Sequence, residues 1–223
     1  MPSDGTPLDR RTVLKRIGTT AAVTSGLLAA SAPGAAEVRE KTRLIDSYHD
    51  PRSVRSAFAS HGSEVRSKLV AEGFVAEDFD FGALDVELDP DANGVEPEAD
   101  DASAGVTAIT KDGTTTALAA VSTSSATHEI ALFVQPERDE AYALVEPTGG
   151  GDRVLVTEDQ VSPEGCLGSR CTDSWCDSPC YKTAEELSCD ENCENCKVTG
   201  TKCTCHGCSC DDRAWCTTEC SYC

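Results

Sequence analysis

The chain has 223 residues, of which 39 are Asp or Glu and 19 are Lys or Arg, so its net charge at neutral pH is −20. A surface this acidic argues against nucleic-acid binding, because proteins that bind nucleic acids neutralise the phosphates with Lys and Arg. All 14 cysteines lie between Cys166 and Cys223. A segment this rich in thiols forms disulfides, binds metal, or does both.

The N-terminus has the order of features found in an export signal. Arg10 and Arg11 precede an uncharged, mildly apolar run that ends in small residues. This resembles a twin-arginine signal peptide over residues 1–36, with cleavage after Ala32 or Ala36. The run is too short and too rich in Ala, Gly and Thr for a membrane span. We therefore predict a secreted, extracellular protein that is exported by the twin-arginine translocase.

One helix and an acidic linker are predicted over residues 37–105. Asp50 and Pro51 have the residue types of an N-cap and a first helical turn. Apolar residues then recur at helical spacing along one face. They are Val54, Phe58, Val65 and Leu69. Since Gly73 ends the pattern, we place a single helix at about residues 51–72.

Residues 106–160 change to the two-residue alternation of β-strands. The expected strands are Val106–Thr110, Thr115–Ser122, His128–Val134, Glu140–Val145 and Arg153–Thr157. Turn residues such as Gly113 and Pro136 separate them. Together with the helix at residues 50–72, these strands predict one α+β domain that contains a single helix and an antiparallel β-meander.

No catalytic constellation is recognisable in the sequence. His49, His61 and His128 have no neighbouring cysteine and no glycine-flanked serine. We therefore predict that the protein is not an enzyme.

The acidic residues are spread along the chain rather than gathered in one block. This distribution resembles the solvated surfaces of proteins from extreme halophiles, where high salt screens the repulsion. We expect a secreted protein of a halophilic archaeon. Outside the cell its thiols meet an oxidising environment, which favours disulfides.

After a linker at residues 161–165, residues 166–223 are predicted to form a small cysteine-rich domain stapled by disulfides. The segment has few Leu, Ile, Val or Phe residues, so it needs cross-links, and its number of cysteines is even. The spacing C-x3-C-x2-C at Cys189 recurs at Cys216 and places cysteines on one helical face. The predicted disulfide cysteines are Cys166, Cys171, Cys176, Cys180, Cys189, Cys193, Cys196, Cys203, Cys205, Cys208, Cys210, Cys216, Cys220 and Cys223. Their pairing stays open.

Zinc binding is the alternative for the same segment. The residues with the types of tetrahedral zinc ligands are Cys203, Cys205, His206, Cys208 and Cys210. Tryptophans and tyrosines among the cysteines favour a packed mini-core instead. We therefore predict disulfides and no cofactor.

The order of export signal, acidic domain and cysteine-rich end resembles the precursors of small halocins of the C-eight type, the peptide bacteriocins of haloarchaea. Arg10, Arg11 and the array from Cys166 to Cys223 carry this resemblance. It implies an antimicrobial C-terminal peptide and a processing protease that cuts between Glu158 and Gly165. It also implies that the N-terminal domain is a carrier or immunity region that binds the peptide.

The charge of the C-terminal segment predicts the kind of target. The best-known halocins of this type have apolar peptides suited to membrane attack, whereas residues 166–223 contain ten acidic and five basic residues. Membrane insertion would bury unpaired charge. We therefore expect a target protein on the cell surface. A secreted interaction module with the same layout is a further alternative.

Overall fold

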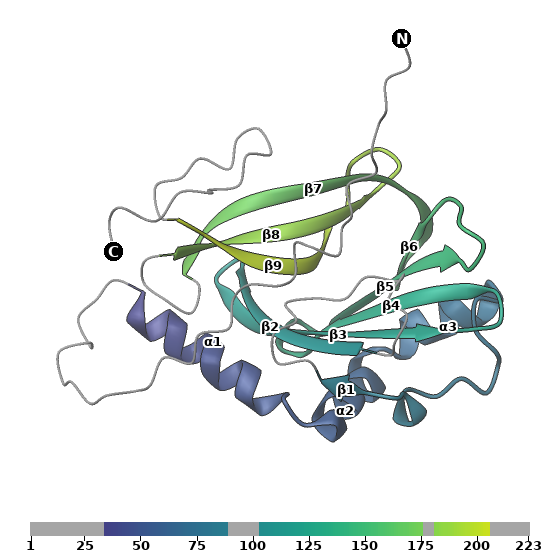
Figure 1. Ribbon diagram of the computed structural model, residues 1–223, viewed down its shortest axis with the longest axis horizontal. Helices are drawn as coiled ribbons and strands as arrows, with labels where there is room; N and C mark the ends of the chain where they lie inside the picture. Colours follow the sequence, from purple (N-terminus) through teal and green to yellow (C-terminus); the bar gives the residue numbers. More distant parts are fainter. Residues whose placement is uncertain (1–33, 89–102, 176–180, 206–223) are drawn as a thin grey trace, which may run out of the picture.

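The computed structural model describes residues 34–88, 103–175 and 181–205. These residues form an α+β fold that combines three helices with a long β-sheet (Figure 1). The helices are α1 (Ala35–Ser47), α2 (Pro51–His61) and α3 (Ser63–Ala71), with short 3-10 segments η3 (Phe81–Ala83) and η4 (Pro136–Arg138). The strands are β1 (Glu87–Leu88), β2 (Ser103–Lys111), β3 (Thr114–Ser124), β4 (His128–Gln135), β5 (Glu140–Pro147), β6 (Val154–Thr157), β7 (Val161–Trp175), β8 (Tyr181–Asp190) and β9 (Lys197–Cys205).

The nine strands lie in the sheet in the same order as in the chain. Each pairs with the next in antiparallel fashion, except that β1 runs parallel to β2. Short turns make this order possible; Asp112 and Gly113, both at positive φ, link β2 to β3. The predicted meander over residues 106–160 is therefore confirmed as β2–β6.

The prediction of one helix at residues 51–72 is wrong, because the chain forms two helices there. The first begins as expected, with the Asp50 carboxylate accepting a hydrogen bond from Arg52 N at 2.7 Å. It ends at His61, and an added Cβ on the next residue, Gly62, would lie 2.6 Å from the Phe81 ring. The sequence also did not predict α1, whose buried face contains only Lys41 and Leu44. None of the described helices is long and apolar enough to cross a membrane.

Both faces of the meander are buried, and different elements cover each face. On one face, Phe58 of α2 and Leu69 of α3 pack against β-strand residues such as Leu132. On the other face, Phe133 and its neighbours pack against Val198 of β9. The sheet thus folds over itself: α2 lies below the meander in Figure 1, and β7–β9 lie above it.

The predicted linker at residues 161–165 forms the first part of β7. Val161, Ser162 and Pro163 pair with β6, and Glu164 N donates to Arg153 O at 2.7 Å. The chain therefore passes from the meander into the cysteine-rich strands without leaving the sheet.

Candidate functional site

The cysteine-rich strands dock on the meander through a surface that we call the strand interface. It consists of Thr107, Gln135, Glu140 and Tyr142 on the meander, Lys41 on α1, and Thr183, Lys197, Val198 and Thr201 on β8 and β9. These residues hold β7–β9 over the face of the meander that contains Phe133. The buried apolar side chains on this face form a hydrophobic cluster that we call the second core. We consider the strand interface the candidate functional site.

The centre of the strand interface is apolar, with a single anchored hydroxyl. Val198 is only 1% exposed, and the rings of Phe133 and Tyr142 stack beside it with centroids 5.2 Å apart. The Tyr142 hydroxyl donates to the carbonyl oxygen of Val198 and accepts from Gln135 Nε2, the latter at 3.1 Å. Burial raises the pKa of Tyr142, so its hydroxyl stays protonated and remains a donor.

An ion pair closes one side of the interface. Lys197 Nζ on β9 lies 2.5 Å from Glu140 Oε1 at the start of β5, and Arg138 Nε lies 3.4 Å from Glu140 Oε2. Burial alone would raise the pKa of Glu140, but the hydrogen bond and charge of Lys197, with Lys111 and Arg138 nearby, lower it. Ionised Glu140 is therefore a stabilising group of the folded chain.

We expect Glu140→Gln to destabilise the protein at neutral pH and to lose this effect in acid. A lowered folded-state pKa means that ionised Glu140 stabilises the fold above its unfolded pKa of about 4.3, and that this contribution disappears as the pH falls through the folded-state pKa. The expected loss near neutral pH is about 1 kcal/mol. Denaturant unfolding from about pH 7 to about pH 3 measures it, with the exposed Glu72→Gln as control. A difference from the unmodified protein that does not change with pH would contradict this role.

The opposite side of the interface is polar and includes α1. The hydroxyls of Thr107 on β2 and Thr201 on β9 lie 2.9 Å apart. Lys41 of α1 is 5% exposed, donates to Thr183 Oγ1 on β8 at 3.2 Å and pairs with Glu37 at 3.4 Å. The first helix therefore contacts the cysteine-rich strands directly.

Four cysteines meet at the turn between β8 and β9. Cys166 and Cys193 lie at disulfide distance with Cα atoms 5.5 Å apart, as do Cys189 and Cys196 with Cα atoms 4.0 Å apart. The predicted helical arrangement of Cys189, Cys193 and Cys196 is wrong, because β8 ends at Asp190 and a turn follows.

A single carboxylate organises this turn. Asp190 accepts hydrogen bonds from Asn195 Nδ2 at 2.6 Å and from the backbone N–H groups of Glu194 and Asn192 at 2.8 and 3.1 Å. The side-chain bond from Asn195 and these two backbone bonds lower the pKa of Asp190. The carboxylate thus takes the place of backbone partners in a turn where Cys193 and Asn195 both have positive φ.

The remaining predicted site residues fall in two groups. Cys171 lies on β7, and Cys203 and Cys205 lie two residues apart on β9. Outside the described residues lie Arg10, Arg11, Cys176, Cys180, His206, Cys208, Cys210, Cys216, Cys220 and Cys223. Within the described ranges, no group of three or more His, Cys, Asp or Glu side chains is placed to hold a metal ion.

Sequence reasoning did not identify the strand interface. The available signal was the unbroken apolar run from Ile130 to Val134 in β4, since a strand that is apolar on both sides requires cover on both faces of its sheet. The cover for the second face comes from β8 and β9, whose sequences are largely polar.

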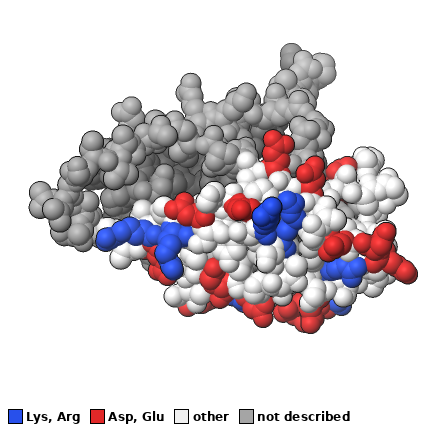
Figure 2. All heavy atoms as spheres, turned by 90° about the horizontal axis from the view of Figure 1, so that it is seen from below, with Lys and Arg blue, Asp and Glu red and all other residues white. Residues whose placement is uncertain are grey.

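The surface on the helical side is mixed in charge. In the view from below in Figure 2, Lys and Arg side chains are interspersed with Asp and Glu. Such a mixture on this face lacks the clustered basic footprint of a nucleic-acid interface.

No family model, curated protein or solved structure matches the chain.

Proposed function

We propose that this chain is an exported, halocin-like precursor in which the domain before residue 160 carries and restrains a cysteine-rich antimicrobial segment. The strand interface is the observation that supports this best. It gives the N-terminal domain a binding surface for β7–β9. The contacts are an apolar centre around Val198 and an ion pair between Glu140 and Lys197. A carrier or immunity domain requires such a surface, because it must hold the segment and cover it.

The twin-arginine pathway exports proteins that are already folded. A cleavage site that leaves α1 intact therefore fits the proposal better than one that removes part of it. Val38 N donates to Gly34 O at 2.9 Å at the start of α1. Cleavage after Ala32 leaves this helix intact, whereas cleavage after Ala36 would remove its first residues. Within this proposal, cleavage after Ala32 is therefore the alternative that keeps α1 whole.

The surface of the cysteine-rich strands supports a protein target rather than a lipid bilayer. Leu167, at 60% exposed, is the one large apolar side chain that is exposed among the described residues. Its neighbours Ser169 and Arg170 are exposed and polar, and so is Glu186 on β8. Insertion of this surface into a bilayer would bury the charged side chains of Arg170 and Glu186, which is costly in a hydrocarbon environment.

A second candidate function is an exported interaction module that works as an intact chain. The continuity of β6 and β7 favours it, because Val156 pairs with Val161 and leaves a turn of only three residues between the two strands. In that case the cysteine-rich strands would never be released.

The protein recovered from the culture medium of the producing cells tests the proposal. We expect a cysteine-rich fragment whose mass is lower by about 14 Da than that of the fully reduced fragment, because each disulfide removes two hydrogens. The fragment is expected to inhibit related archaea, and an excess of the N-terminal fragment from the same medium is expected to relieve the inhibition. The matched control is the N-terminal fragment with Glu140→Lys, in which the new lysine faces Lys197 with a like charge. This variant should relieve the inhibition less.

Three outcomes would contradict the proposal. An uncut chain in the medium would favour the intact interaction module. Free thiols with bound zinc would favour the metal-binding alternative. A cut and fully oxidised fragment without inhibitory activity would refute the antimicrobial role.

A further inference from the structure

One short turn separates the two halves of the chain. Glu158, Asp159 and Gln160 connect β6 to β7, and all three are exposed. Thr157 N donates to Gln160 O at 2.8 Å, and Gln160 N donates to Thr157 Oγ1 at 3.2 Å, so the turn is closed at its base. Its peptide bonds lie on the surface of an otherwise folded region.

The residues that follow this turn are held by the sheet. Val161 to Pro163 pair with β6, and Glu164 bonds Arg153 through its backbone N–H and through its carboxylate, the latter at 3.6 Å. A Cβ on Gly165 would lie 2.4 Å from Asp190 O, so the backbone of Gly165 is packed against the end of β8. A protease needs an exposed segment that it can draw into an extended conformation. In the folded chain, the span from residue 158 to residue 165 offers this only at the turn.

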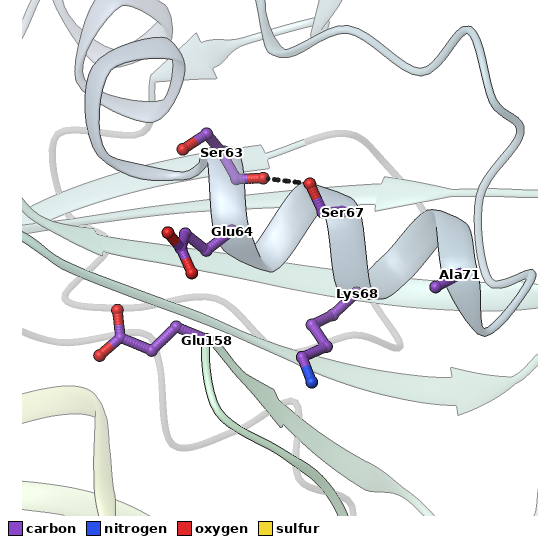
Figure 3. A pocket seen from close by; sticks show the side chains of 6 residues that line it. All are labelled: Ser63, Glu64, Ser67, Lys68, Ala71 and Glu158. Carbon is purple, nitrogen blue, oxygen red and sulfur yellow. Dashed lines mark hydrogen bonds between the residues drawn. The ribbon is translucent and has the colours of Figure 1, made fainter.

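The turn lies beside a shallow polar hollow on α3. Figure 3 shows the hollow between the side chains of one face of α3 and Glu158. Its lining residues are Ser63, Glu64, Ser67, Lys68, Ala71 and Glu158. Lys68 Nζ donates to the carbonyl oxygen of Asp159 at 3.2 Å, which tethers the turn to the helix. The tethered carbonyl belongs to one of the peptide bonds that a protease would have to reach.

We propose that this turn is the processing site of the precursor, cut after Glu158, Asp159 or Gln160 by an endoprotease that accepts acidic residues at or next to the bond that it cuts, and that Lys68 slows the cut by tethering the turn. The reaction adds one water across one peptide bond and leaves a new carboxylate and a new amino group. This inference rests on the proposed function, since it places the cut that the precursor requires. All 14 cysteines lie after the turn, so no disulfide of this sequence joins the two products. They part when the strand interface opens.

Sequencing the N-terminus of the cysteine-rich fragment from the culture medium tests the site. We expect the fragment to begin at Asp159, Gln160 or Val161. A fragment that begins at any other residue overturns the proposal. If the chain is recovered uncut, the full chain is treated with a Glu- and Asp-specific endoprotease in concentrated salt, and the cuts within residues 103–205 are mapped by mass spectrometry. A first cut in this range outside the turn then overturns the proposal.

Variants of the full chain test the tether in the same digestion. Lys68→Ala is expected to speed the cut at the turn about two- to fivefold, the effect of losing one hydrogen bond. Arg52→Ala, on the exposed face of α2, is the matched control and should leave the rate unchanged. Equal rates for both variants would overturn the role of Lys68. Growth inhibition is not read in this digestion, so a failed turn assignment is distinguishable from an inactive peptide.

Discussion

Val198→Asp is expected to detach β7–β9 from the meander and to lower the free energy of unfolding by several kcal/mol. Val198 is almost fully buried beside Phe133 and Tyr142. An unpaired carboxylate there would lose its hydration without gaining a partner. Denaturant unfolding in concentrated salt, followed by circular dichroism, measures the change.

The matched control is Ser169→Asp, which adds the same charge to an exposed position on β7. We expect it to change stability by less than about 0.5 kcal/mol. If the two variants unfold at the same denaturant concentration, β9 does not pack on the second core and the strand interface is refuted. In culture, Val198→Asp is further expected to yield cut products that no longer elute together.

Removal of the Cys166–Cys193 pair is expected to destabilise the chain more than removal of the Cys189–Cys196 pair. The first closes a sequence separation of 27 residues and the second a separation of 7. Because a cross-link restricts the unfolded chain more when its loop is longer, the expected losses are about 3.5 and about 2.5 kcal/mol. The double variants Cys166→Ala/Cys193→Ala and Cys189→Ala/Cys196→Ala serve as controls for each other.

The comparison requires oxidised protein, and intact mass verifies that each double variant has lost one bridge. Unfolding without reductant then gives the two free energies. Equal losses, or a larger loss for the Cys189–Cys196 pair, would contradict these pairings. The same experiment in excess reductant should remove the difference, since both variants and the unmodified chain then lack cross-links.

The parts of the fold that depend on local sequence were predictable. Asp50 and Pro51 mark the start of α2 because capping and the fixed φ of proline act within one helical turn. The strands of the meander were found because Gly113 and similar turn residues bound runs of β-forming residues. These signals need no knowledge of distant contacts.

The break between α2 and α3 could not be predicted in this way. The helical periodicity runs through Gly62, and the close approach of Phe81 from a later segment, which a side chain at this position would block, is a contact that the local sequence does not reveal. The strand conformation of the cysteine-rich segment could not be predicted for a related reason. Their spacing of three and four residues suits a helix, but pairing with neighbouring strands and packing on Tyr142 decide the conformation.

The strand interface is also built from contacts between residues far apart in the chain. Lys41 reaches Thr183, and Tyr142 reaches Val198. A single sequence shows that the meander needs cover on its second face, but it does not show which segment supplies it. The candidate site could therefore be located only from the structure, whereas the cysteine-rich end could be recognised from the sequence.

The register of β7 and β8 has a consequence for how the chain is oxidised. Cys166 lies directly opposite Cys189 in the sheet, yet each approaches a different cysteine from the following turn, Cys193 and Cys196. Fourteen thiols allow on the order of 10⁵ pairings. If the meander folds before the thiols are oxidised, packing of β9 against its second face brings these four thiols together before either bond forms. In that order of events the cysteine-free half acts as a template for these two cross-links, whose formation depends on residues that contain no sulfur.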